Sequence, residues 1–323
     1  MKVLVTGANG LLATHIIKNL LEKNYQVKGL LRSPEKFVLP EHENLELVTA
    51  DINDEEKITK IIATVDAVIH AAALTTPNFI TYEPYYNVNV LGTKIIVDAC
   101  LTNHIKKLVY VSSANSIGFG TLENPGNETL PPSSPFKETF YAKSKYEGEL
   151  LVLAATHKLN ATVVNPTFML GAFDAKPSSG KIILMAGKKI MFYPPGGKNF
   201  VNATEAAEGV IKALEIGKTG ERYLLSGENL SYGQFFKRVQ PILGTPKIMI
   251  KVPKPILLLV GYVGELLRFT KIKTPLSIHN MRILCVKNYY SNTKSQSHLQ
   301  LEFTSINKGI IAAVNWFKHQ KMR

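Results

Sequence analysis

The feature that most constrains the fold is a glycine-containing turn between two apolar segments at the start of the chain. Lys2–Thr6 has the continuous apolar character of a buried strand, and Leu11–Lys23 carries apolar side chains at helical spacing. Between them the glycines allow a tight turn that brings a pyrophosphate close to the helix N-terminus, where free N–H groups and the helix dipole favour negative charge. The turn therefore predicts a dinucleotide-binding site formed by Gly7, Asn9, Gly10 and Leu11.

The first half of the chain continues this alternation of strand and helix. The further predicted strands are Gln26–Leu31, Leu45–Thr49, Ala67–His70, Leu108–Ser112 and Ala161–Asn165. The further predicted helices are Asp54–Ile62, Val88–Cys100 and Tyr141–Thr156. Continuous apolar strands that alternate with helices indicate an α/β fold with a Rossmann-type, doubly wound parallel sheet covered on both faces.

After residue 165 this rhythm is interrupted by segments rich in proline and glycine. Thr204–Ile216 still predicts a helix and Arg222–Leu225 a strand. We therefore expect residues 1–166 to form the dinucleotide-binding domain. Residues 167–323 would form mainly a smaller, interleaved substrate-binding domain, with 200–228 returning to the first domain.

The net charge of +13 is unevenly distributed along the chain. Residues 1–170 contain 15 basic and 17 acidic residues, whereas residues 171–323 contain 23 basic and 8 acidic ones. Such asymmetry indicates either an anionic partner or membrane surface, or a solvated lysine-rich face. No nucleic-acid motif accompanies the charge, so we expect no nucleic-acid partner. The two cysteines cannot form a disulfide framework, and no histidine pair has helical zinc-site spacing, so we expect no metal.

Neither a signal-peptide core nor a membrane-spanning stretch is evident, and we expect a cytoplasmic protein. The most apolar segment is Pro255–Phe269, with Lys254, Arg268 and Lys271 at its ends. We interpret it as a buried cap helix; the alternative is an interfacial helix resting on anionic lipid.

Cofactor choice should depend on the end of the second strand, where a carboxylate would bind the adenosine 2′-hydroxyl. The sequence there is Leu31-Arg32-Ser33, which has no carboxylate, and Arg32 suits a 2′-phosphate. NADP(H) is therefore favoured over NAD(H). Asp51 and Ile52, after the third strand, would flank the adenine, although Asp51 would equally serve as a helix N-cap.

Tyr141 and Lys145 stand four residues apart at the start of a predicted helix, on one face and one turn apart. A cation near a tyrosine favours the phenolate and lowers its pKa, which would make Tyr141 a general acid–base. Ser113 follows the fifth strand, where doubly wound sheets bind ligands, and would hydrogen-bond a substrate carbonyl oxygen. These three residues form a candidate catalytic triad.

Together these motifs resemble an extended short-chain dehydrogenase/reductase of the NAD-dependent epimerase/dehydratase family, in its dihydroflavonol-4-reductase-like branch. The motifs that carry the resemblance are Thr6-Gly7-x-x-Gly10, Asp51-Ile52, His70-Ala71-Ala72, Asn87-Val88-Asn89-x-x-Gly92-Thr93, Ser112-Ser113-Ala114, Tyr141-x-x-x-Lys145, Asn165-Pro166 and Gly220–Asn229. The resemblance implies that Tyr141 donates the proton and that Lys145 also holds the nicotinamide ribose. It implies that Asn89 fixes the active-site helix, that Ala71 and Ala72 line the cofactor, and that Pro166 abuts the nicotinamide.

Candidate substrate contacts are Asn165, Phe168 and Lys198. Sugar-nucleotide epimerases of the family often carry an arginine that grips the substrate diphosphate, and Lys198 stands at that place here. Lysine lacks the bidentate fork of arginine. We therefore favour NAD(P)H-dependent reduction of a ketone or aldehyde of a small or apolar substrate to an alcohol. The alternatives are a nucleotide-sugar epimerase or dehydratase with tightly bound NAD, and a non-catalytic dinucleotide sensor. Expected partners are this small molecule and, as an open alternative, a second copy in a homodimer.

Overall fold

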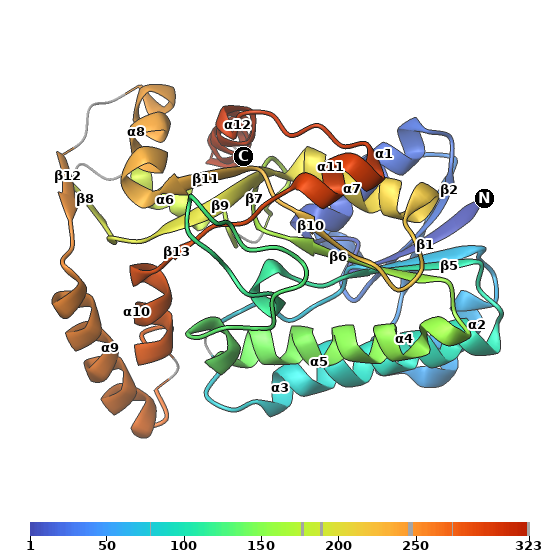
Figure 1. The fold of residues 1–323 in the computed structure, drawn as a ribbon. Helices are drawn as coiled ribbons and strands as arrows, with labels where there is room; N and C mark the ends of the chain where they lie inside the picture. The colour runs from blue at the N-terminus through green and yellow to red at the C-terminus, as the bar shows by residue number, and fades with distance from the viewer. Residues whose placement is uncertain (78, 176–177, 188–189, 245–247, 273, 322–323) are drawn as a thin grey trace.

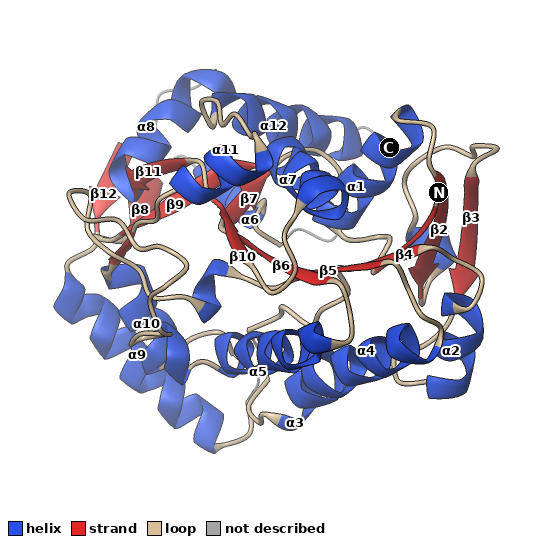
Figure 2. Ribbon diagram, turned by 45° about the vertical axis from the view of Figure 1, so that its right-hand side comes forward, coloured by secondary structure: helices blue, strands red, loops and turns tan. Residues whose placement is uncertain are grey.

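The computed structural model describes residues 1–323 except 78, 176–177, 188–189, 245–247, 273 and 322–323. Its centre is a seven-stranded sheet in which every pairing is parallel (Figures 1 and 2). Across the sheet the strands are β10 (Arg222–Leu225), β6 (Ala161–Pro166), β5 (Lys107–Val111), β4 (Ala67–His70), β1 (Lys2–Thr6), β2 (Gln26–Leu31) and β3 (Leu45–Thr49). The strand order reverses at β1, which lies between β2 and β4. The predicted doubly wound sheet is confirmed.

Helices cover both faces of this sheet because the strands are apolar on both sides. One face packs against α1 (Leu11–Glu22) and α7 (Ala203–Ile216), with α11 (Thr293–Leu299) alongside α7. The other face packs against α2 (Glu55–Ile62), α4 (Gly92–Thr102) and α5 (Phe140–Ala154). Two separate hydrophobic cores result, one between each layer of helices and the sheet. Figure 1 shows the two layers of helices on either side of the sheet.

The later part of the chain builds a second region with its own apolar core. Its sheet contains β11 (Glu228–Ser231), β9 (Gly197–Asn202), β13 (Lys287–Asn288) and β7 (Phe168–Leu170). Its helices are α6 (Lys181–Ala186), α8 (Tyr232–Leu243), α9 (Lys254–Phe269), α10 (Ile278–Cys285) and α12 (Asn307–Lys321), and β8 (Ile190–Tyr193) pairs with β12 (Ile248–Lys251). The chain passes from the second region to the first and back again. β9 belongs to the second sheet, the following α7 and β10 cover and extend the first sheet, and β11 belongs to the second sheet again.

Several short elements lie in the connections. They are α3 (Glu83–Tyr85), the π-helical turn η2 (Tyr86–Leu91) and the 3₁₀ turns η1 (Pro34–Lys36), η3 (Ala114–Ser116), η4 (Phe136–Glu138) and η5 (Ala155–His157). The helix predicted at Val88–Cys100 thus consists of η2 followed by α4. Hydrophobic spacing does not distinguish a π turn from an α turn over so few residues.

The helix predicted at Pro255–Phe269 is present as α9, but the prediction that it is buried is wrong. Within α9 only Gly261 and Gly264 are buried. Leu259 is 64% exposed and Leu266 68% exposed, so the apolar side chains face outward. Within the described residues, no helix combines the length and apolarity that crossing a bilayer requires.

Candidate active site

The glycine turn lies where the strand order reverses, between the carboxyl end of β1 and the start of α1. Gly7 adopts φ 72°, and a Cβ at this position would stand 2.8 Å from the Cα of Ala72. Gly10 is the N-cap of α1; no side chain caps this end, and the first turn has no acidic residue. The backbone N–H groups of the first turn are therefore available to a phosphate, which fits the pyrophosphate of a dinucleotide. Asn9 and Leu11 flank Gly10 and are partly exposed.

Thr6 joins the ends of β1 and β4. Its Oγ1 accepts hydrogen bonds from the backbone N–H groups of Ala71 and Ala72, at 3.1 and 3.0 Å. His70 lies between Thr6 Oγ1 and Thr93 Oγ1, at 2.8 and 3.1 Å, and burial lowers its pKa to about 3. His70 is therefore a neutral structural residue that fixes the edge on which the cofactor would lie.

The other predicted cofactor residues lie at the same edge of the sheet. Arg32 is exposed directly after β2 and has no ion-pair partner among the described residues. Asp51 is exposed, and its Oδ1 accepts a hydrogen bond from the backbone N–H of Asn53 at 2.9 Å, while Asp54 caps α2. Ile52 is buried, and Pro166 is buried at the end of β6.

Ser113, two residues after the end of β5, and Tyr141, near the start of α5, come close together in the structure. The Ser113 side chain is near enough to that of Tyr141 to oppose the rise in the tyrosine pKa, and the Ser113 Oγ accepts a hydrogen bond from the backbone N–H of Asn115. Thr139 caps α5, its side chain accepting from the backbone N–H of Ala142, so the helix begins just before Tyr141. A serine and a tyrosine hydroxyl that lie close together can hydrogen-bond one carbonyl oxygen.

Lys145 differs from its predicted role in one respect. Burial raises the pKa of Tyr141, with only Ser113 opposing the rise, so the prediction that Lys145 lowers this pKa is wrong for this structure. The Lys145 Nζ lies 4.3 Å from the centre of the Tyr110 ring, and burial lowers the lysine pKa to about 7, against the opposing charge of Glu149. Loss of hydration disfavours the charged forms of Tyr141 and Lys145, and this effect on their pKa values outweighs any stabilisation of one charge by the other.

Asn89 fixes two elements around the triad. Its Oδ1 accepts from the backbone N–H of Leu74 at 2.7 Å, and its Nδ2 donates to Leu74 O and to Ser144 Oγ at 3.1 and 2.9 Å. Ser144 lies on α5 between Tyr141 and Lys145. Asn89 therefore positions α5 from the π-helical turn, as the resemblance implies, and π turns are common at functional sites.

A buried polar network behind Ser113 was missed by the sequence analysis. Glu149 Oε2 accepts hydrogen bonds from Ser116 Oγ and Asn165 Nδ2, both at 2.8 Å, and Glu149 Oε1 lies 2.7 Å from Arg222 Nε in an ion pair. The available signal was spacing, because Tyr141, Lys145 and Glu149 follow one another at four-residue intervals on one helix face.

The interpretation of Asn165 as a substrate contact is not supported by its surroundings. The side chain is fully buried, and its Nδ2 donates to Ser113 O, Ser116 Oγ and Glu149 Oε2. Asn165 thus holds the strand end that carries Ser113. A polar residue at a strand end is compatible with either role, and only the tertiary contacts distinguish them.

Lys198 and Phe168 lie together in the second region. The Lys198 Nζ is 5.4 Å from the centre of the Phe168 ring and 5.8 Å from that of Phe136, which precedes Tyr141 by five residues. Burial lowers the pKa of Lys198 to about 8, and no described acidic side chain pairs with it. The adjacent Asn199 is buried and bonded to Thr167, Gly227 and Asn229, so it has a structural role.

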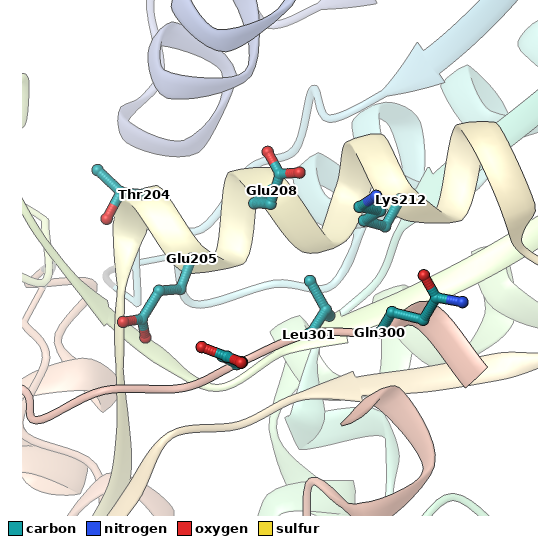
Figure 3. A pocket seen from close by; sticks show the side chains of 7 residues that line it. Thr204, Glu205, Glu208, Lys212, Gln300 and Leu301 are labelled. Atoms are coloured by element: carbon teal, nitrogen blue, oxygen red, sulfur yellow. The ribbon is translucent and has the colours of Figure 1, made fainter. Parts of the chain in front are cut away.

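The surface hollow in Figure 3 is separate from these residues. It lies beside α7 and is bounded by Thr204, Glu205, Glu208, Lys212, Gln300, Leu301 and Glu302. None of them is a candidate site residue, and Glu205 is already bonded to Thr304. Among the described residues, no cluster of His, Cys, Asp and Glu could hold a metal ion.

Comparison with known proteins places this site in a family. The sequence pattern of the NAD dependent epimerase/dehydratase family matches residues 3–226. Sterol demethylase protein B of Methylococcus capsulatus is 27% identical over 330 residues, covering all of both chains. A Synechocystis protein named "Putative dihydroflavonol 4-reductase" is 28% identical over 330 residues, covering 98% of this chain and 94% of its own. The crystal structure of gox2253 matches with a TM-score of 0.85 and 29% identity, covering 98% of each chain.

The chain belongs to the NAD dependent epimerase/dehydratase family, and the predicted resemblance is confirmed. Members of this family are oxidoreductases and epimerases that use a nicotinamide dinucleotide. The uncapped N-terminus of α1 and the Gly7 turn fit this class of cofactor.

Proposed function

We propose that this protein is an NADPH-dependent oxidoreductase that reduces a ketone or aldehyde of an apolar substrate to an alcohol. The observation that carries the proposal is the proximity of the Ser113 and Tyr141 side chains, with Lys145 one helical turn beyond Tyr141. The name of the Methylococcus relative, which refers to a sterol, is in keeping with an apolar substrate.

The proposed chemistry divides between cofactor and protein. A bound reduced nicotinamide supplies the hydride that bonds to the carbonyl carbon. Ser113 and Tyr141 hydrogen-bond the carbonyl oxygen, and Tyr141 gives its proton to that oxygen as the C=O π bond opens. The raised pKa of Tyr141 keeps the phenol protonated at neutral pH, so the donor form is present before each turnover.

Regeneration of the phenol requires a second proton-exchanging group nearby. Lys145, whose pKa lies near 7, gains and loses a proton readily at neutral pH. We assign it the return of a proton to Tyr141 from solvent, together with the ribose contact that the resemblance implies.

The NADPH preference rests on Arg32, which is exposed after β2 without an acidic partner among the described residues. A guanidinium suits a 2′-phosphate, and the sequence at the end of β2 has no carboxylate for a 2′-hydroxyl.

Lys198 supports a further property of the substrate. A partly buried cation that no described carboxylate pairs with, held over two aromatic rings, favours a substrate with an anionic group. The same position argues against the nucleotide-sugar alternative, because a lysine does not provide the bidentate phosphate contact of an arginine.

The test is Tyr141→Phe, assayed by NADPH absorbance against a panel of ketones and aldehydes. Loss of a general acid reduces turnover by about 10²- to 10⁴-fold, and NADPH binding should persist. Tyr146→Phe, on the same helix, is the matched control and should retain activity. Full turnover by Tyr141→Phe, or sugar-nucleotide turnover without net NADPH oxidation, would contradict the proposal.

A further inference from the structure

The outward face of α9 is a continuous apolar stripe. Ile256, Leu259, Val263 and Leu266 recur every three or four residues and are all exposed. This spacing places them on one side of a helix. Phe269, 87% exposed, lies at the end of the same helix.

The orientation of α9 is fixed by its opposite face. A Cβ at Gly264 would stand 1.5 Å from the Leu276 carbonyl oxygen, and one at Gly261 would stand 3.0 Å from the Cα of Ile278. The helix therefore packs through its glycines on the start of α10 and cannot turn its apolar stripe inward.

The β8–β12 ribbon extends the apolar surface beyond the start of α9. Ile190 pairs with Ile248 and Phe192 with Ile250, and all four side chains are exposed. Alternate residues of a strand share a face, so the four lie together, while Met191 points into the core. The ribbon leads directly into α9, and both lie at the end of the molecule opposite β3 in Figure 2.

The exposed charge around this surface is basic. Residues 229–301 contain 11 Lys and Arg and one acidic residue, Glu265. The Glu265 carboxylate accepts from the Ile278 backbone N–H and faces Arg268, whereas Lys251, Lys254 and Lys271 are exposed at the two ends of α9. An apolar face bordered by lysines is complementary to an anionic lipid surface. A second copy would bring like charges together.

We propose that α9 and the β8–β12 ribbon dock on the surface of an anionic lipid bilayer. The apolar stripe enters the boundary between headgroups and acyl chains, and the lysines contact the headgroups. The same helices reach the candidate active site. Arg268 donates to Phe79 O in the segment after β4, and His279 of α10 lies 3.0 Å from Glu138, three residues before Tyr141. Docking therefore brings this side of the candidate active site toward the bilayer, which suits the apolar substrate of the proposed function on which this step rests.

Vesicle co-sedimentation of the full chain tests this proposal. We expect the protein to pellet with phosphatidylcholine vesicles that contain phosphatidylglycerol, less with phosphatidylcholine alone, and less as salt is raised. The variant Leu259→Glu/Leu266→Glu should reduce the bound fraction at least tenfold, and Lys251→Glu/Lys254→Glu should remove the preference for phosphatidylglycerol.

The matched control is Leu122→Glu, which changes a leucine 61% exposed in the loop between η3 and η4, outside α9 and the β8–β12 ribbon, and should bind like the wild type. Far-ultraviolet circular dichroism and turnover of a water-soluble carbonyl compound report whether each variant is folded. Absence of vesicle binding, or unchanged binding by Leu259→Glu/Leu266→Glu, would overturn the proposal. So would a wild-type dimer that this variant dissociates in analytical ultracentrifugation, since the surface would then belong to a second copy.

Discussion

Glu149 and Arg222 form an ion pair behind the candidate active site, with 2.7 Å between Glu149 Oε1 and Arg222 Nε. The Glu149 side chain is fully buried on α5, one turn beyond Lys145, and Arg222 begins β10. The other carboxylate oxygen holds Ser116 and Asn165, which both bond the carbonyl of Ser113. The pair thus connects the helix that carries Tyr141 to the strand end that carries Ser113.

Glu149→Gln should destabilise the protein by about 3–5 kcal/mol, because it leaves the Arg222 charge buried without its partner. Urea unfolding measures this change. The double variant Glu149→Gln/Arg222→Met should recover part of the lost unfolding free energy. The double-mutant cycle built from these variants should give a favourable coupling energy for the pair. Asp98→Asn, which breaks the exposed Lys94–Asp98 pair, is the control and should cost less than about 1 kcal/mol. Equal effects of the two single variants would contradict a structural role for the buried pair.

Arg32→Ala should weaken NADPH binding by about 10- to 100-fold, because a charge-assisted hydrogen bond contributes about 1.5–3 kcal/mol. NADH binding should change little, since NADH has no 2′-phosphate. Fluorescence titration with both cofactors measures the ratio, and Lys36→Ala, an exposed cation nearby, serves as the control. An unchanged ratio, or tighter NADH than NADPH binding by the wild type, would refute the assignment.

Lys198→Met should raise KM for ketones that carry a carboxylate by about 10- to 100-fold, since it removes one charged hydrogen-bond donor. The kcat for those ketones should change little, and uncharged ketones should keep both constants. Lys237→Met, on the exposed side of α8, is the control. A loss of kcat on charged and uncharged ketones alike would show that Lys198 supports the fold rather than the substrate.

Stability should fall as the pH drops below about 6.5, through His70. Burial lowers the His70 pKa to about 3, so between these values the unfolded chain binds a proton that the folded chain does not. The unfolding free energy therefore rises with pH across this window and loses that contribution on acidification. Chemical denaturation at several pH values measures the slope. His70→Asn should reduce this slope, and the remainder comes in part from His15, whose pKa burial lowers to about 4. Nuclear magnetic resonance should find the His70 ring neutral at pH 5; a protonated ring there would contradict the prediction.

The local patterns of the sequence were sufficient to predict most helices and strands of the first region. Continuous apolar strands identified the sheet, and the glycines at 7 and 10 identified the turn, because both depend on residues that are neighbours in the chain. The spacing of Tyr141 and Lys145 placed both on one helix face for the same reason. Ser113 directly follows the fifth predicted strand, and this position placed it at the edge of the sheet where ligands bind.

Contacts between distant segments decided what the patterns left open. Arg222 reaches Glu149 because β10 joins the sheet beside β6. The Asn165 side chain donates its hydrogen bonds to this network, so it does not face a substrate. Burial, not sequence distance, governs the pKa of Tyr141. An apolar helix has the same periodicity whether its apolar face packs inward or outward. The close contacts of Gly264 with Leu276 and of Gly261 with Ile278 determine that α9 presents its apolar face to its surroundings.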